Sequence, residues 1–142
     1  MNDSRQAPPI AIAPPLTDVE FCYLETIGRV SGRPHEVEMW YAVAGEGDRL
    51  YLLSGGRDNA DWVKNLRRQP RVRVRIAGVW YAGVAAVAEG GPDDLPARQA
   101  LVAKYYGWRD GPLPNAWARE ALPVAIRIEG IADIQLAASE TG

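Results

Sequence analysis

The sequence holds 142 residues with a mass of 15.5 kDa, which is the length of a single domain with one hydrophobic core. Its 47% hydrophobic and 24% charged residues are typical of a globular protein and exclude a chain that stays disordered. A net charge of -2, a pI of about 5.4, one cysteine and one histidine argue against a nucleic-acid partner, an internal disulfide and a Cys/His metal site.

The first 16 residues are rich in proline and alanine and show no apolar period, so we predict a flexible arm there and a single domain over residues 17–142. Four prolines also interrupt this stretch where a signal peptide needs a continuous apolar run. No segment approaches the roughly 20 apolar residues of a transmembrane helix. We therefore expect a cytoplasmic protein.

Glycine and proline interrupt the rest of the chain about every eight to twelve residues, which is typical of a compact β architecture. Alternation with a period of two is clear over residues 35–43, where the odd positions from Val37 to Val43 are apolar. The pattern predicts strands over residues 21–27, 35–43, 49–54, 71–76, 79–88 and 123–128.

Two helices interrupt these strands. Asp58 or Asn59 can cap the first, and Pro70 ends it. Pro92 opens the second, which ends near Gly107, and a short helical turn follows later in the chain. About six strands with two helices, mainly β within the α+β class, favour a split antiparallel β-barrel over a doubly wound sheet, because closure removes exposed strand edges.

Six basic residues and no acid lie between Lys64 and Arg75. The window fits a solvated face, a nucleic-acid surface or a groove for a small polyanion. The acidic pI and the lack of aromatic residues among Arg71, Arg73 and Arg75 argue against nucleic acid.

Two glycine-containing loops are candidate ligand sites. Residues 28–34 combine two glycines with Arg29 and Arg33, and fit either an anion-binding loop or a plain hairpin. Residues 53–59 run from a strand through a glycine pair to a helix N-terminus, and fit either a phosphate cradle or a glycine-rich turn. They lack the lysine of a P-loop.

Three further residues bear on chemistry. Tyr105 and Tyr106 fit either the core or a planar ligand, to which a tyrosine hydroxyl can supply a proton. His35 is the one side chain of a type that titrates near neutral pH, and it follows the first loop directly; a structural role fits it as well.

The segments TIGRVSGRPHEVEMWY and LYLLSGGRDNADWVKNLRRQPRVRVRI resemble the deazaflavin-dependent nitroreductase family, which belongs to the flavin-reductase-like and pyridoxamine-phosphate-oxidase-like split β-barrel proteins. The resemblance covers about residues 23–76, with a looser match at residues 123–126. Its most specific part is the helix with Trp62 and Asn65, followed by a basic pair, Pro70 and an alternating Arg/Val strand.

The resemblance implies that both loops hold the ring and phosphate of coenzyme F-420, an 8-hydroxy-5-deazaflavin, while basic groups meet its oligoglutamate tail. The cofactor-binding residues it points to, together with the loop cations, are Arg29, Ser31, Gly32, Arg33, His35, Leu53, Ser54, Gly55, Gly56, Arg57, Asn59, Asp61, Trp62 and Asn65. Tyr105 and Tyr106 are the expected catalytic contacts with the acceptor.

The chain departs from the family pattern at Val30, where relatives carry a lysine or arginine, and at His35, where they carry an arginine. Arg57 or Arg33 can replace the lost cation. The expected function is hydride transfer from reduced coenzyme F-420 to a quinone, enone or nitro compound. FMN in the same fold, or binding of a flavin or deazaflavin without turnover, are the alternatives.

The expected partners are a small-molecule acceptor and a second copy of the chain. Trp40, Trp80 and Tyr81 suit an interface in such a homodimer, and suit the core equally well.

Overall fold

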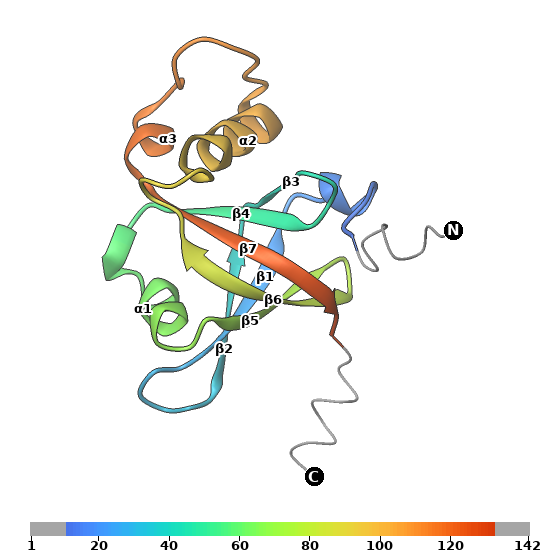
Figure 1. Cartoon of the computed structure of the whole chain (residues 1–142), viewed down its shortest axis with the longest axis vertical. Helices are drawn as coiled ribbons and strands as arrows, with labels where there is room; N and C mark the ends of the chain where they lie inside the picture. The colour runs from blue at the N-terminus through green and yellow to red at the C-terminus, as the bar shows by residue number, and fades with distance from the viewer. Residues whose placement is uncertain (1–10, 133–142) are drawn as a thin grey trace.

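The computed structural model describes residues 11–132, and the fold is a seven-stranded antiparallel sheet that curls into a half-barrel (Figure 1). The strand order is β2-β1-β5-β6-β7-β4-β3. The strands are β1 (Cys22–Ile27), β2 (Pro34–Met39), β3 (Ala42–Ala44), β4 (Arg49–Ser54), β5 (Arg71–Ile76), β6 (Val79–Val87) and β7 (Leu122–Ile131). The helices are α1 (Asp61–Arg68), α2 (Asp94–Tyr106) and α3 (Ala116–Glu120), with short 3-10 turns η2 (Leu16–Asp18) and η3 (Arg57–Asn59).

The two edges of the sheet, β2 and β3, are consecutive in the chain. Residues 35–43, predicted as one strand, are therefore two: β2 pairs with β1, and after a break at Trp40 and Tyr41 the chain joins β4 as β3. The apolar alternation runs across the break because Tyr41 is itself buried. This change of partner leaves β2 and β3 as the two edges of the sheet, and the split of the half-barrel lies between them.

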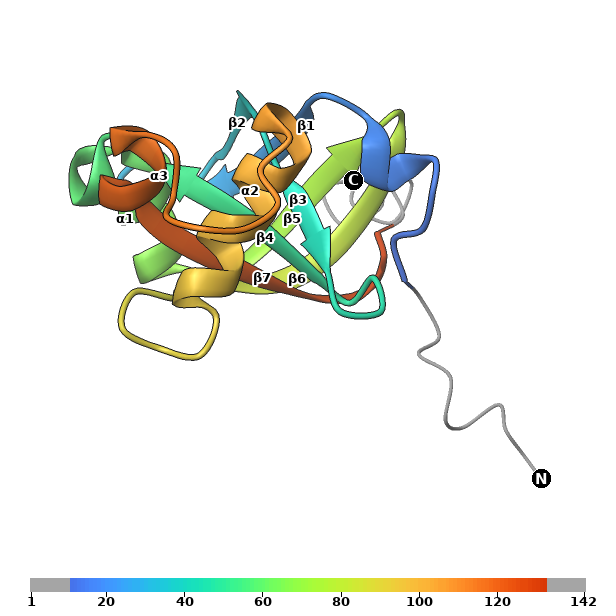
Figure 2. The same ribbon diagram turned by 90° about the horizontal axis from the view of Figure 1, so that it is seen from above.

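The core fills the concave side of the sheet, where Leu24, Leu50 and Val74 lie with the buried face of α1. A second apolar cluster lies on the other face of β3 and β4, where Ala97 and Leu101 of α2 cover it. Figures 1 and 2 show α3 beside α2, on the outside of the barrel. The helices thus cover different faces of the sheet.

Helix α1 begins at Asp61 with Ala60 as its N-cap, so the prediction that Asp58 or Asn59 caps it is wrong. Both residues belong to η3 instead, and Asp58 forms an ion pair with Arg67. The predicted end of α2 is confirmed, since Gly107 forms the C-cap at φ 68°, a conformation that favours glycine.

The sequence-predicted arm, residues 1–16, falls mostly outside the described residues. Where it is described, Ile12 is buried in the core and its N–H donates to the carbonyl of Gly47 at 2.9 Å. This part of the segment packs on the barrel. No helix within residues 11–132 has the length and apolar character needed to span a bilayer.

Two of the aromatic residues expected at an interface or in the core lie on opposite faces of β6. Tyr81 belongs to the core cluster. Trp80 lies on the outer face, 9% exposed, with the Arg73 guanidinium 4.3 Å from its ring centroid. Tyr81 is therefore a core residue, and arginine side chains cover Trp80.

Candidate functional site

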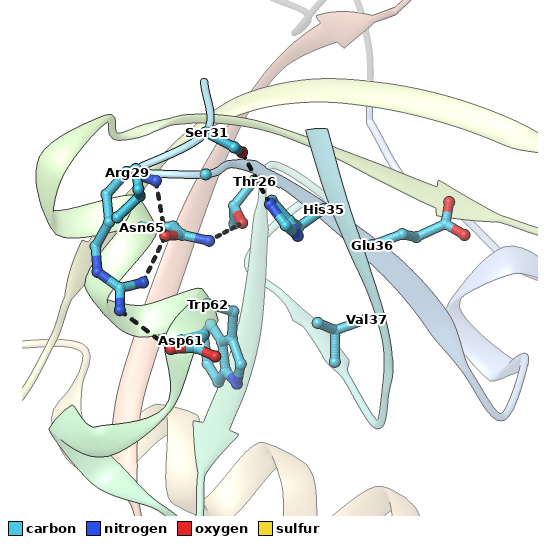
Figure 3. Close-up of a pocket in the computed structure, with 11 residues that line it drawn as sticks. Thr26, Arg29, Ser31, His35, Glu36, Val37, Asp61, Trp62 and Asn65 are labelled. Atoms are coloured by element: carbon cyan, nitrogen blue, oxygen red, sulfur yellow. Dashed lines mark hydrogen bonds and ion pairs between the residues drawn. The ribbon is translucent and has the colours of Figure 1, made fainter. Parts of the chain in front are cut away.

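A cavity of about 380 Å³ lies where the β1–β2 loop, β2 and α1 meet (Figure 3). Its volume is within the usual range for small-ligand pockets. Part of the predicted site comes together here. The lining residues are Thr26, Gly28, Arg29, Val30, Ser31, His35, Glu36, Val37, Asp61, Trp62 and Asn65.

Asn65 links the β1–β2 loop to α1 through hydrogen bonds. Its Oδ1 accepts hydrogen bonds from the backbone N–H of Arg29 at 3.1 Å and from Nη1 of the same residue at 2.9 Å, while its Nδ2 donates to Thr26 Oγ1 at 3.1 Å. The second guanidinium nitrogen of Arg29 pairs with Asp61 at 3.2 Å. Asn65 is only 4% exposed, so its bond to Thr26 is shielded from water, whereas the Arg29–Asp61 pair lies at the surface.

Ser31 and His35 fold over Gly28 at the rim of the cavity. Ser31 Oγ lies 3.3 Å from His35 Nε2 and accepts the N–H of Arg33 at 3.1 Å. A Cβ added to Gly28 would come within 2.6 Å of both Ser31 Oγ and His35 Nε2. Glycine is therefore required for this close approach.

The loop also offers backbone donors. The N–H groups of Gly28, Arg29, Gly32 and Arg33 are bonded within the chain. Among the described residues, no partner takes up the N–H groups of Val30 and Ser31. Two amides, the Ser31 hydroxyl and the His35 imidazole thus form a donor set suited to an anion.

The opposite wall of the cavity is apolar. Trp62 from α1 and Val37 from β2 contribute to this wall and lie on either side of the cavity in Figure 3. Val30, where the resemblance leads us to expect a cation, is 92% exposed at the rim. A cavity with one polar rim and one apolar wall fits a ligand that joins a charged group to a planar ring.

The second predicted loop lies elsewhere, and none of residues 53–59 lines the cavity. Leu53 and Ser54 are buried at the end of β4, and Ser54 Oγ donates to the carbonyl of Arg57 at 3.0 Å. Gly55 faces α3, since an added Cβ would lie 3.8 Å from Trp117 Cδ1. Asn59 is exposed in η3.

This junction is nevertheless rich in free donors. Within residues 11–132, no hydrogen bond takes up the N–H groups of Gly55, Gly56 and Asp58. Gly56 is right-handed at φ -82° and Arg57 left-handed at φ 52°, an alternation that makes a concavity of backbone N–H groups. The junction is therefore a second candidate cradle.

Arg57 and Arg33, which were expected to replace the cation missing at Val30 and His35, do not line the cavity. The Arg57 guanidinium pairs with Glu89 and donates to the carbonyl of Glu120. The side chain of Arg33 is exposed and has no hydrogen-bond partner among the described residues. Arg29 is the one guanidinium that lines the cavity within the described part of the chain.

The arginine side chains of β5 lie on the more exposed face of the strand, as predicted. Carboxylates on other strands neutralise their charge. The cross-strand ion pairs are Arg71–Glu129, Arg73–Glu25 and Arg75–Glu36. Arg67 pairs with Asp58. Much of the basic window therefore forms an ion-paired surface.

The two candidate catalytic tyrosines lie apart from the cavity. Tyr105 stacks on Trp40 with ring centroids 4.2 Å apart, and its hydroxyl donates to the carbonyl of Glu20 at 2.6 Å and accepts the N–H of Tyr41 at 3.1 Å. Burial raises the pKa of Tyr105 to about 12. Tyr106, 53% exposed, lies edge-on to Trp40.

Trp117 completes this aromatic cluster, with its ring centroid 5.8 Å from that of Trp40. Trp117 and Thr26 escaped the sequence prediction. The register of β1 against β2, which pairs Thr26 with His35, is the signal that identifies Thr26. Trp117 approaches Gly55 only through the tertiary fold, so no local pattern identifies it.

The model of a family described as F420H(2)-dependent quinone reductase matches residues 5–127. No curated protein matches the chain.

Solved structures share the fold. A conserved hypothetical protein of Mycobacterium tuberculosis is 22% identical, with a TM-score of 0.68 over 85% of this chain and 84% of its own. A putative 5-nitroimidazole antibiotic resistance protein of Bacteroides thetaiotaomicron is 15% identical, with a TM-score of 0.65 over 86% and 84%. A structure described as F420 reductase is 18% identical, with a TM-score of 0.55 over 82% and 93%. At these identities the likeness shows the split-barrel fold alone.

Proposed function

Since the chain belongs to the F420H(2)-dependent quinone reductase family, we propose that it transfers a hydride from reduced coenzyme F-420 to a small organic acceptor, either a quinone, an enone or a nitro compound. The observation that carries the proposal is the cavity at Gly28, Ser31 and His35, with its anion-suited rim and apolar wall. When bound, the reduced coenzyme supplies the hydride, and the protein binds, orients and shields it.

The donor set of the cavity fits this coenzyme, which joins a planar deazaflavin ring through a phosphate to an oligoglutamate tail. In our proposal the phosphate lies against Ser31, His35 and the amides of the loop. Trp62 forms the apolar wall, and Asn65 holds the loop in place. A cavity of about 380 Å³ encloses only part of such a ligand, so the remainder must lie along the surface.

The ring then extends toward the junction at Ser54–Arg57, where the free N–H groups of Gly55 and Gly56 suit a polar ring edge. Trp117 lies beside this junction. We propose that the exposed side of the cluster formed by Trp40, Tyr106 and Trp117 contacts the acceptor. Aromatic side chains are suited to planar acceptors because they stack on them.

Of the two tyrosines, Tyr106 is the one we assign to the acceptor. Its side chain is 53% exposed and its hydroxyl has no hydrogen-bond partner within residues 11–132, so it can pass a proton from water to the acceptor, which gains one proton together with the hydride. The hydroxyl of Tyr105 is committed to backbone groups. Tyr105 therefore positions Trp40 in this proposal.

FMN and turnover-free binding remain the alternatives. The FMN alternative rests on the shared fold alone, for example on structures described as putative pyridoxamine 5'-phosphate oxidases. Turnover-free binding is favoured by one observation: the family cation is replaced by the exposed Val30, while Arg57 pairs with Glu89. Both alternatives use the same barrel.

We also propose that the protein acts in the cytoplasm as a homodimer. Trp40 is the remaining interface candidate among the three aromatic residues, because Tyr81 is in the core and Trp80 is covered by Arg73. Light scattering of the eluted protein should give twice the mass of the chain. A mass of 15.5 kDa would exclude the dimer.

The test of the function is acceptor reduction. Purified protein is mixed with reduced coenzyme F-420 and with a quinone, an enone or a nitroaromatic, and reoxidation of the coenzyme is followed by absorbance. Enzyme-dependent reoxidation with at least one class supports the proposal. Coenzyme binding without reoxidation across the panel would favour the turnover-free alternative.

A further inference from the structure

We propose that protonation of His35 controls the binding of the coenzyme's phosphate, so that this site binds its anionic ligand more tightly as the pH falls. The inference rests on the proposed function and concerns the regulation of the same cavity. His35 is the only histidine of the chain. Its ring lines the cavity beside Ser31.

The imidazole of His35 lies beside the hydrogen-bond donors of the β1–β2 loop. His35 Nε2 and Ser31 Oγ lie together above Gly28, and a Cβ at residue 28 would come within 2.6 Å of each. The unbonded amides of Val30 and Ser31 are on the same loop. An anion held by these donors therefore lies next to the imidazole.

The charged side chains that line the cavity leave no net positive charge when His35 is neutral. With His35 neutral, the residues that line the cavity carry one guanidinium, that of Arg29, against two carboxylates, those of Glu36 and Asp61. Asp61 pairs with Arg29, and Glu36 pairs with Arg75 from outside the cavity. No full positive charge in the lining is left for an anion. Protonation of His35 supplies one.

Among the residues that the structure describes, no acidic side chain that lines the cavity is directed at the imidazole of His35. Figure 3 shows the Glu36 carboxylate pointing away from His35, and Asp61 on the far side of the cavity beside Arg29. Thr26, which faces His35 in the β1–β2 register, is uncharged, and Arg33 on the loop is exposed. Within residues 11–132, the imidazole of His35 has Ser31 as its only hydrogen-bond partner. A protonated His35 is thus free to pair with the ligand.

His35 stands where the family resemblance leads us to expect an arginine. An arginine keeps its charge at every physiological pH, whereas histidine exchanges its proton near neutrality. The substitution makes anion affinity depend on pH. Linkage requires the reciprocal effect, since a ligand that prefers protonated His35 must also favour its protonation.

The experiment measures binding by calorimetry at pH 6 and pH 8 with two ligands: coenzyme F-420, and its deazariboflavin fragment, which has the same ring and no phosphate. The ring hydroxyl is common to both, so its own titration cancels in the ratio of affinities. We expect coenzyme F-420 to bind about fivefold or more tightly at pH 6 than at pH 8, relative to the fragment.

Three variants separate the causes. His35→Gln should bind weakly with little pH dependence, and His35→Arg should bind tightly at both pH values. Arg33→Gln removes an exposed cation from the same loop and should leave the ratio between the two pH values unchanged. Because His35 is exposed, its replacements should keep the fold, which circular dichroism checks.

A second readout is direct. With one histidine in the chain, its C2–H proton gives a single resonance in the ¹H NMR spectrum. Coenzyme F-420 should move the pH midpoint of this resonance upward, and the fragment should not. Equal affinity at both pH values with an unmoved midpoint would overturn the inference and leave the proposed function standing. Failure to bind the coenzyme at any pH would overturn both.

Discussion

One oxygen of Asn65 holds both the backbone amide and the guanidinium of Arg29. The same side chain donates to Thr26, which links α1, β1 and the β1–β2 loop through a single buried amide. The position of the loop therefore depends on a helix residue that lies 36 positions further along the chain. This link positions the loop that carries Ser31 and the proposed anion rim.

Replacing Asn65 with alanine should lower the free energy of unfolding by about 2 kcal/mol, because the part-buried donors of Arg29 and the buried hydroxyl of Thr26 lose their partner. Urea denaturation measures the change. Asn65→Asp keeps the acceptor and loses the donor, so it should cost less. A loss below about 0.5 kcal/mol in Asn65→Ala would contradict the assigned role.

Gly28→Ala tests the close approach at the cavity rim. The added methyl would meet Ser31 and His35 at 2.6 Å and push both side chains from the rim, so coenzyme affinity should fall about tenfold. The matched control is Gly91→Ala, where the added Cβ meets only the carbonyl of Ala88, at 3.5 Å. Equal coenzyme affinity for Gly28→Ala and wild type in a titration would show that this rim does not bind the ligand.

Removing the hydroxyl of Tyr105 should affect stability, whereas removing that of Tyr106 should affect turnover. Tyr105→Phe removes hydrogen bonds to Tyr41 and Glu20 and should cost about 1 to 2 kcal/mol of stability, measured by urea denaturation. Tyr106→Phe should leave stability nearly unchanged and lower kcat with little change in KM, because it removes only the proposed proton path. If Tyr106→Phe kept full kcat with every acceptor, the proton path would run elsewhere.

Lys104 should make stability rise with pH above 8. Its ammonium donates to the carbonyls of Val19 and Tyr41, and burial lowers its pKa from 10.5 to about 8. Between pH 8 and 10.5 the unfolded chain holds the proton that the folded chain has released, so raising the pH favours the folded state.

The useful window is pH 8 to 9, because Cys22 opposes the trend at higher pH. Burial raises the pKa of its thiol from 9.0 to about 12, so the folded state there keeps a proton that the unfolded state loses. The free energy of unfolding of wild type, relative to that of Lys104→Met, should rise across this window. A flat or falling difference would refute the lowered pKa.

Local patterns predicted most of the sheet and the end of α2. Alternation of apolar residues defined β5, and the left-handed Gly107 ended the helix where expected. The break between β2 and β3 escaped prediction because Tyr41 keeps the apolar pattern while the chain changes its pairing partner. Period-two patterns report burial, and burial continues through the break.

The candidate site was predicted in part. The residues on the first loop and on α1 come together because Asn65 joins them. The cation expected at Arg57 does not reach the cavity, since Glu89 and the carbonyl of Glu120 hold it. The sequence left the arginines of β5 open between a solvated face and a groove for a small polyanion, because their neutralising partners lie on other strands. Such cross-strand pairings appear only when the register is known.

The most direct test of the central claim is a fluorescence titration of the purified protein with coenzyme F-420 and, in parallel, with FMN. We expect binding of coenzyme F-420 on the order of micromolar, at least about tenfold tighter than FMN, and weaker in Trp62→Leu and Ser31→Ala. Arg49→Ala, which breaks an ion pair with Asp93 outside both the cavity and the Ser54–Arg57 junction, should bind as wild type does. Preferential binding of FMN, or coenzyme binding indifferent to Trp62 and Ser31, would contradict the account.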